Sequence, residues 1–181
     1  MKARCSIVGE PALLSGKGIM QSNFKTLVKS IAAPLAVGAV SGLLAREGIQ
    51  NFGTGRRPFL SPPGWVFPMV WILLYLLSGV GAYRVRTSKA DKAHIEEAVT
   101  IYNLFLFVHF LWVIFFFTFD LQIFAFAWLI AVWLLAAVAA VLFYSIKKPA
   151  GVLMLLFLLW TTYAGYLNLS SCILQLGRNV V

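Results

Sequence analysis

Apolar residues run along most of this chain in long unbroken stretches, and polar residues gather in the short segments between them. A helix rises 1.5 Å per residue, so about 20 residues cross a bilayer core of roughly 30 Å. Segments such as 152–160 are apolar on every side, whereas the strands of a membrane barrel alternate apolar and polar residues. The pattern therefore predicts an all-α membrane protein, a bundle of five transmembrane helices. The predicted spans are residues 27–45, 65–83, 98–119, 121–146 and 150–176.

The connections between these spans are uneven in length. Asp120 is the only Asp, Glu, Lys or Arg between residues 98 and 146, so the third and fourth spans must turn tightly around it. A single helix over that stretch is the alternative, but it would far overrun the bilayer. The one long connection, 46–64, holds three prolines in its second half, and proline restricts both itself and the residue before it. This segment is either a lid over the bundle or an ordinary interfacial turn.

The two ends of the chain differ from the spans. Residues 1–24 form a polar, Gly-containing tail that we expect to be disordered, or an upstream extension before a second start at Met20. No apolar run follows the first charges, so the tail does not read as a cleavable signal peptide. Residues 25–181 form the predicted transmembrane domain.

Composition agrees with lipid as the solvent. The 181 residues are 61% hydrophobic and 12% charged, with a mean hydropathy of +0.87, which a soluble domain of this size cannot bury. The formal net charge is +9, but the basic residues are divided unequally between the two sides of the predicted membrane. The positive-inside rule then places the amino terminus in the cytoplasm and argues against nucleic acid as a partner. The amino-terminal side carries Lys2, Arg4, Lys17, Lys25, Lys29, Arg84, Arg86, Lys89, Lys92, Lys147 and Lys148, and the other side carries Arg46, Arg56, Arg57 and Arg178.

Most conventional chemistry has no residues to carry it here. No Asp, Glu, Lys or Arg lies in the middle of the last four spans, which disfavours proton-coupled or ion-coupled transport. His94 and His109 are too far apart to share a haem iron, and Cys5 and Cys172 lie on opposite sides of the predicted topology. The sequence predicts no metal site and no required cofactor. It favours a protein that is not an enzyme in the acid–base or nucleophilic sense.

Aromatic residues are the remaining candidate chemistry. On three predicted spans, aromatic and polar residues recur every three or four positions and so share one helix face. Packing between helices explains any one of them, but Trp71, Trp112 and Trp160 lie inside their apolar stretches rather than at interfacial edges. Together the faces favour an internal pocket for a flat, apolar ligand such as a tetrapyrrole or sterol. The faces are Phe67, Trp71, Tyr75 and Ser78; Tyr102, Phe105, His109, Trp112 and Phe116; and Trp160, Ala164, Asn168 and Ser171.

Three segments resemble one known family. The run 57–71, RPFLSPPGWVFPMVW, resembles the most recognisable stretch of the tryptophan-rich sensory protein/translocator protein family (TspO, also called peripheral-type benzodiazepine receptor). Trp112 with the phenylalanines that follow it is similar to its N-x-x-W-x-x-x-F-F segment, and residues 160–168, WTTYAGYLN, to its W-x-x-F-A-x-x-L-N segment. The resemblance covers roughly residues 25–176.

The resemblance implies a five-helix bundle, often a homodimer, that binds porphyrins such as protoporphyrin IX and synthetic aromatic ligands beneath the first loop. Trp71 and Trp160 match the tryptophans linked in the family to light-dependent porphyrin breakdown, and we treat them as candidate catalytic residues. The candidate ligand-binding residues, which include Phe67 and Asn168 from the aromatic faces, are Phe52, Pro62, Phe67, Trp71, Tyr75, His109, Trp112, Trp160, Ala164 and Asn168.

Several positions depart from the family's pattern. Asn51-Phe52 replaces a Trp-Tyr pair, so one hydroxyl contact is lost, and His109 replaces an Asn, which makes polar anchoring pH-sensitive in principle. Leu156-Phe157 replaces a Pro-Tyr pair, which predicts a straighter fifth helix. The fifth span also lacks the cholesterol pattern of animal members, so we expect no strong sterol preference.

These observations lead to one functional hypothesis and two alternatives. The first is a membrane receptor or sensor that binds porphyrins and related flat ligands and supports their photo-oxidative breakdown. The alternatives are a transporter or channel for porphyrins or lipids, and a non-catalytic membrane scaffold. Phe-rich spans and the missing sterol pattern favour a multi-pass protein of a bacterial cell membrane over an organelle.

Overall fold

The computed structural model describes residues 11–54 and 60–176, with side chains placed for residues 23–50 and 60–173. No strand occurs within these ranges, and five helical segments are long and apolar enough to cross a membrane. The predicted all-α fold with five spans is confirmed, whereas the cytoplasmic amino terminus stays a prediction. The helices are α1 (Pro11–Leu44), α2 (Arg46–Thr54), α3 (Val66–Arg86), α4 (Lys92–Val113), the π-helical turn η1 (Ile114–Thr118), α5 (Gln122–Ile146) and α6 (Lys148–Leu176).

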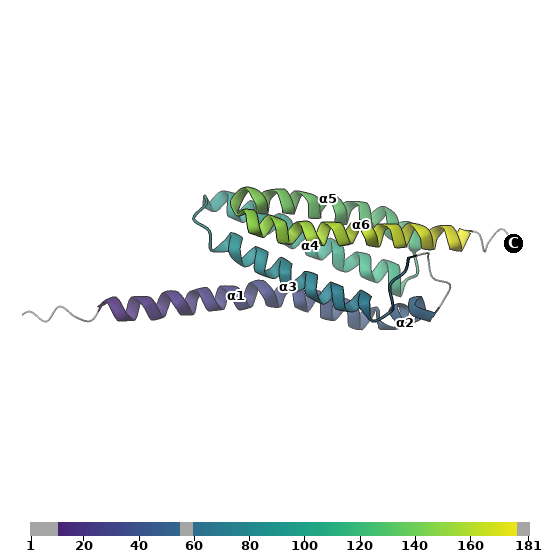
Figure 1. Ribbon diagram of the computed structural model, residues 1–181, viewed down its shortest axis with the longest axis horizontal. Coiled ribbons are helices and arrows are strands. Elements are labelled where there is room, and N and C mark those ends of the chain that lie inside the picture. The colour runs from purple at the N-terminus through teal and green to yellow at the C-terminus, as the bar shows by residue number, and fades with distance from the viewer. Residues whose placement is uncertain (1–10, 55–59, 177–181) are drawn as a thin grey trace, which may run out of the picture.

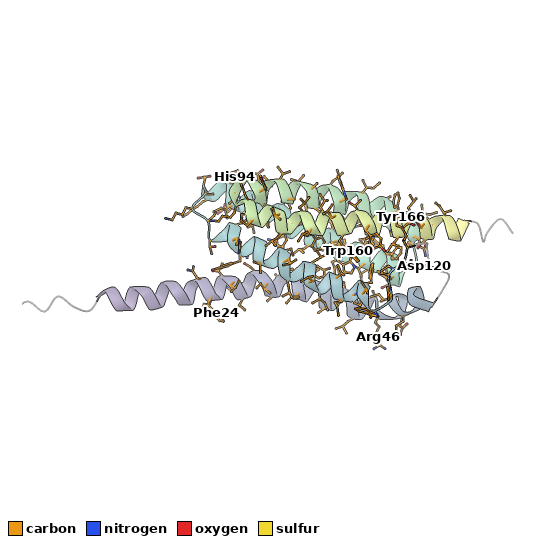
Figure 2. All side chains as sticks on the ribbon, viewed as in Figure 1. Phe24, Arg46, His94, Asp120, Trp160 and Tyr166 are labelled. Carbon is orange, nitrogen blue, oxygen red and sulfur yellow. The ribbon has the colours of Figure 1, made fainter. Side chains whose placement is uncertain are left out.

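The helices pack in an order that differs from their order along the chain. Helices α3 to α6 lie side by side, and α1 runs along α3 and projects beyond the bundle at its amino-terminal end (Figure 1). α6 packs between α3 and α5, while α4 packs on α5 and also contacts α1. Arg46 and Asp120 lie at one end of the bundle and His94 at the other (Figure 2). The polar connections are thus separated to the two ends, as a membrane-spanning bundle requires.

Helical structure extends beyond the predicted spans in two segments. Helix α1 is described from Pro11 onward, and residues 1–10 lie outside the described part, so the division into a tail of residues 1–24 and a transmembrane domain of residues 25–181 stays a prediction. The connection 46–64 is also helical over its first half, where α2 carries Glu47 in its first turn. A negative charge near a helix amino terminus stabilises it through the helix dipole.

The tight turn expected around Asp120 is present. Phe119 ends the α4–η1 segment, Asp120 has a φ of 52°, and α5 begins at Gln122. Asp is one of the few non-glycine residues that adopt this left-handed conformation readily. The amide of Gln122 donates a hydrogen bond of 2.9 Å to the Asp120 carboxylate, which fixes the turn.

Gly79 sets the distance between α1 and α3. A Cβ at this position would lie 2.8 Å from the carbonyl oxygen of Ser30 and 2.9 Å from the Cα of Ile31. Both are backbone atoms of α1, so no side-chain rotation relieves the overlap. Small residues allow such close approach between membrane helices, where van der Waals packing is a main source of association.

We therefore expect Gly79→Ala to push α1 away from α3 and to destabilise the protein by about 1–3 kcal/mol, the usual cost of overpacking. Thermal unfolding in detergent would measure the loss. Gly165→Ala is the matched control, because a Cβ there meets only Leu129 at an ordinary 3.6 Å. Equal stability of the two variants would show that the α1–α3 contact does not depend on Gly79.

Candidate functional site

Trp71 of α3 lies at the centre of an aromatic cluster drawn from three helices. Its ring centroid is 4.6 Å from His109 and 6.0 Å from Trp112, both on α4. On the other side it is 5.5 Å from Phe157 and 6.3 Å from Trp160, both on α6. Edge-on and tilted ring pairs at such distances are attractive beyond the area that they bury. The three aromatic faces predicted from sequence do meet, and they meet at Trp71.

Two side-chain hydrogen bonds join α3 to α4 beneath these rings. The Tyr75 hydroxyl and His109 Nδ1 are 3.0 Å apart, and which of them donates depends on the histidine tautomer. One turn further along, the hydroxyls of Ser78 and Tyr102 are also 3.0 Å apart. All four side chains are buried, so these bonds hold the two helices in one register.

A cavity of about 580 Å³ lies beside the cluster, between α1, α3 and the α4–η1 segment. Its wall is almost wholly apolar or aromatic, and Ser41 and Tyr75 provide its only hydroxyl groups among the described lining residues. The lining consists of Leu35, Gly38, Ala39, Ser41, Gly42, Leu43, Ile49, Phe67, Pro68, Trp71, Ile72, Tyr75, Trp112, Val113 and Phe117.

The cavity opens sideways between α1 and α3. Leu43 and Ile72 line it from these two helices and are 70% and 56% exposed on the outside of the bundle. Both belong to segments apolar enough to span a membrane. The opening therefore faces bilayer rather than water.

The sequence-predicted residues fall into three groups. Phe67, Trp71, Tyr75 and Trp112 line the cavity. His109, Trp160, Ala164 and Asn168 lie behind that wall: His109, Ala164 and Asn168 are buried, and Trp160 is partly buried 6.1 Å from Phe67. Pro62 does not line the cavity, and the side chain of Phe52 lies outside the described residues. Whether the second group touches a ligand stays a prediction.

Sequence reasoning missed the contribution of α1. Six cavity residues come from this helix, including Gly38 and Gly42, whereas the aromatic pattern pointed only to three later spans. These glycines shape the cavity because they have no side chain. A Cβ at Gly42 would meet no atom within 4 Å, so this glycine faces open space. Small residues at a spacing of four on an apolar helix are the pattern that would have found this wall.

The turn η1 explains why the sequence analysis did not include Phe117 among the site residues. The predicted face continues from Trp112 to Phe116, but the cavity is lined by Phe117. A π-helical turn adds one residue to the turn and shifts the face by one position. As a result Phe116 and Phe117 are both buried, with ring centroids 4.7 Å apart, and Phe116 stacks on Trp112.

Four polar atoms in and behind the cluster have no hydrogen-bond partner within the described part of the chain. They are His109 Nε2, Trp112 Nε1, Trp160 Nε1 and Asn168 Nδ2. A buried polar group without a partner costs about 1–3 kcal/mol, so it normally has a structural or functional reason. Three of them belong to the rings of His109, Trp112 and Trp160, which pack on Trp71, and this marks that part of the bundle as the candidate site.

The connection between α1 and α3 is fixed to the bundle at its two described ends. Gly48 of α2 packs so closely on the backbone of Phe117 that only glycine fits there. The Tyr163 hydroxyl of α6 donates a hydrogen bond of 2.6 Å to the carbonyl of Leu60. A lid function for the segment between these two contacts stays a prediction.

These features define the class: an integral membrane protein whose five-helix bundle holds an aromatic, laterally open pocket. The sequence profile of the TspO/MBR family matches residues 30–174, and the chain belongs to that family. A "Tryptophan-rich sensory protein" of Cereibacter sphaeroides is 31% identical over 155 residues, which cover 86% of this chain and 92% of that protein. A "Tryptophan-rich protein TspO" of Chlorobaculum tepidum is 28% identical over 159 residues, 87% of this chain and 99% of its own length. A "Translocator protein" of Bos taurus is 28% identical over 125 residues, 67% and 73% of the two chains.

The resemblance inferred from the three motifs is thus confirmed. So is the expectation of a multi-pass membrane protein, and the bacterial relatives are consistent with a cell membrane.

The Tyr75–His109 bond yields a direct test of how the site is held together. We expect a double-mutant cycle of Tyr75→Phe and His109→Leu to give a coupling free energy of about 0.6–1.7 kcal/mol, the range for hydrogen bonds between membrane helices. Unfolding in detergent would measure each variant. Tyr144→Phe, which alters a half-exposed tyrosine of α5, should change little. A coupling near zero would mean that the two side chains do not hold α3 against α4.

Proposed function

We propose that this protein is a membrane receptor for porphyrins and related flat aromatic molecules, which bind in the cavity between α1, α3 and α4. The observation that carries the proposal is the combination of a large apolar cavity with a tryptophan-centred wall. Membership of the TspO/MBR family agrees with this reading without specifying a ligand.

Size and chemistry of the cavity support a ligand of this class. Pockets of about 300–1,000 Å³ accommodate drug-sized ligands, and 580 Å³ lies within that range. Trp71 and Trp112 offer ring faces and edges against which a flat conjugated molecule can stack. The predominance of apolar wall over polar groups disfavours small charged metabolites.

The polar atoms near Trp71 supply the anchoring that a porphyrin requires. A porphyrin carries carboxylates and ring nitrogens, and the N–H groups of Trp112 and Trp160 lack acceptors in the described structure. When the Tyr75 hydroxyl donates to Nδ1 of His109, the Nε2–H of that histidine is a third donor without an acceptor. Trp112 lines the cavity, and His109 and Trp160 pack on the Trp71 ring that separates them from it.

The lateral opening bears on how a ligand arrives. Because Leu43 and Ile72 border the cavity on the bilayer side, an apolar ligand enters from the membrane without crossing water. The same feature favours a second candidate, a carrier that passes porphyrin or lipid between the two leaflets. Ligand flux into sealed vesicles distinguishes a carrier from a receptor, which binds without net movement.

Any turnover of the ligand would draw on light. The ring centroids of Trp71 and Trp160 are 6.3 Å apart, close enough for the pair to exchange electrons with an excited ligand and with each other. No acid, base or nucleophile beside a reacting atom is needed for such chemistry. Photo-oxidative breakdown, with dissolved dioxygen as the oxidant that accepts the electrons, is therefore a secondary activity of the binding site in this proposal.

Filling the cavity tests the binding claim. Protoporphyrin IX titrated into the detergent-purified protein in the dark should quench tryptophan fluorescence saturably. Gly42→Phe would place a ring in the open space and should weaken binding by about tenfold or more, or roughly 1.4 kcal/mol.

Val40→Phe is the matched control, because Val40 lies on the same helix, is 48% exposed and does not line the cavity. Equal quenching curves for wild type and Gly42→Phe would remove the ligand from this cavity. If no saturable quenching occurs, the aromatic rings around Trp71 serve only to pack the helices together, which favours the scaffold alternative.

The two tryptophans test the photochemical claim separately. We expect Trp71→Phe/Trp160→Phe to bind protoporphyrin IX in the dark within about threefold of wild type, because phenyl rings preserve most of the apolar contact area. Under illumination the loss of porphyrin absorbance should stop. Trp128→Phe/Trp133→Phe, which alters two tryptophans of α5 remote from the cavity lining, is the control. Breakdown at the unmutated rate in the first variant would exclude this pair from the photochemistry.

A further inference from the structure

A second hollow, of about 480 Å³, lies at the end of the bundle opposite Arg46 and Asp120. It is formed where α3 ends, α5 ends and α6 begins, and Arg84 and Lys148 both line it. No acidic side chain lines it, and no ion pair to either cation occurs within the described ranges. Two exposed cations therefore face one hollow without a protein counter-charge.

This hollow continues into an apolar groove on the outer face of α5 and α6. The groove, of about 400 Å³, shares Tyr144 and Val152 with the basic hollow. Its floor is shallow because a Cβ at Gly151 would overlap the backbone of Tyr144, so the two helices touch there. Its further lining consists of Ala137, Ala140, Val141, Ser145, Leu155 and Leu158.

The dimensions of the combined site match one leaflet of a bilayer. From Lys148 to Leu158 helix α6 advances ten residues, or roughly 15 Å. That is half of a hydrocarbon core of roughly 30 Å. The charged end therefore lies at the headgroup level while the groove runs along the acyl region. Val141 and Val152, at 68% and 49% exposure, face the lipid along this path.

We propose that this site binds an anionic phospholipid, with its phosphate between Arg84 and Lys148 and one acyl chain in the groove of α5 and α6. Basic pockets between membrane helices are known headgroup sites, and each cation near the surface contributes about 1 kcal/mol. The guanidinium of Arg84 can engage two phosphate oxygens, and the ammonium of Lys148 adds a point charge. The site is separate from the porphyrin cavity, with which it shares no lining residue.

A second copy of this chain is the competing occupant, since alanines and glycine along a groove also suit helix packing. In a parallel dimer through this face, however, the basic hollows of both copies would approach each other. Arg84 and Lys148 would then repel their equivalents with no acidic residue in the lining to offset them. The charge distribution favours a lipid phosphate.

Native mass spectrometry of the full chain, released from mixed nanodiscs, tests the proposal. Dioleoyl phosphatidylglycerol and phosphatidylcholine with the same chains serve as probes at equal concentration. We expect phosphatidylglycerol to be retained preferentially, and Arg84→Gln/Lys148→Gln to reduce that preference by about tenfold. Ala137→Phe, which fills the groove, should lower retention of both lipids.

Matched controls lie on the same elements or at the same end. Lys25→Gln/Lys89→Gln removes two exposed cations that line neither hollow, and Val138→Phe enlarges a lipid-facing neighbour of Ala137. Both controls should keep the preference for phosphatidylglycerol. Glycerol phosphate added in excess should not displace the lipid, because it lacks the acyl chain.

Three results would overturn the proposal. The first is unchanged retention in Arg84→Gln/Lys148→Gln, and the second is displacement by glycerol phosphate alone. The third is conversion of a dimer to a monomer by Ala137→Phe without loss of lipid, which would assign the groove to a second copy. Unfolding curves for each variant separate these outcomes from a simple loss of structure.

Discussion

Lipid chains are as apolar as the side chains that face them, so helices in a bilayer associate through close packing and hydrogen bonds rather than through exclusion of water. In this protein the contacts of Trp71 meet that requirement. Its ring packs on His109 and Trp112 of α4 and on Phe157 and Trp160 of α6, so that α3, α4 and α6 meet around it. The same ring forms part of the cavity wall. Packing of the bundle and the shape of the site therefore depend on one side chain.

The spans and the faces that meet inside them could be predicted from the sequence, because a helix repeats every 3.6 residues and lipid leaves long apolar stretches plainly visible. The convergence of Trp71, Trp112 and Trp160 follows from that periodicity once the helices pack together. The face of α1 was not predictable in this way. Gly42 contributes to the cavity because it lacks a side chain, and a search for large aromatic residues does not find such a position.

Two local features of the backbone, the π-helical turn η1 and helix α2, also escaped prediction. The extra residue in η1 exchanges Phe116 for Phe117 at the cavity, and nothing in the run of phenylalanines marks where the wider turn falls. Helix α2 forms in a segment whose mixed polar composition reads as a loop. Its contact between Gly48 and Phe117 depends on how two distant segments meet, which no local pattern encodes.

Helix α1 is the long, separately attached wall of the cavity. It packs on α3 and α4, and among the described residues it has no contact with α5 or α6. Its 34 residues extend over roughly 51 Å, far beyond the hydrocarbon core (Figure 1). Its apolar part, Asn23–Leu44, covers roughly 33 Å, and a bilayer thinner than such a stretch is matched by tilting of the helix. Tilt of α1 against α3 changes the width of the opening between Leu43 and Ile72. Membrane thickness, and with it acyl-chain length and lateral pressure, thus becomes a variable that sets access to the pocket.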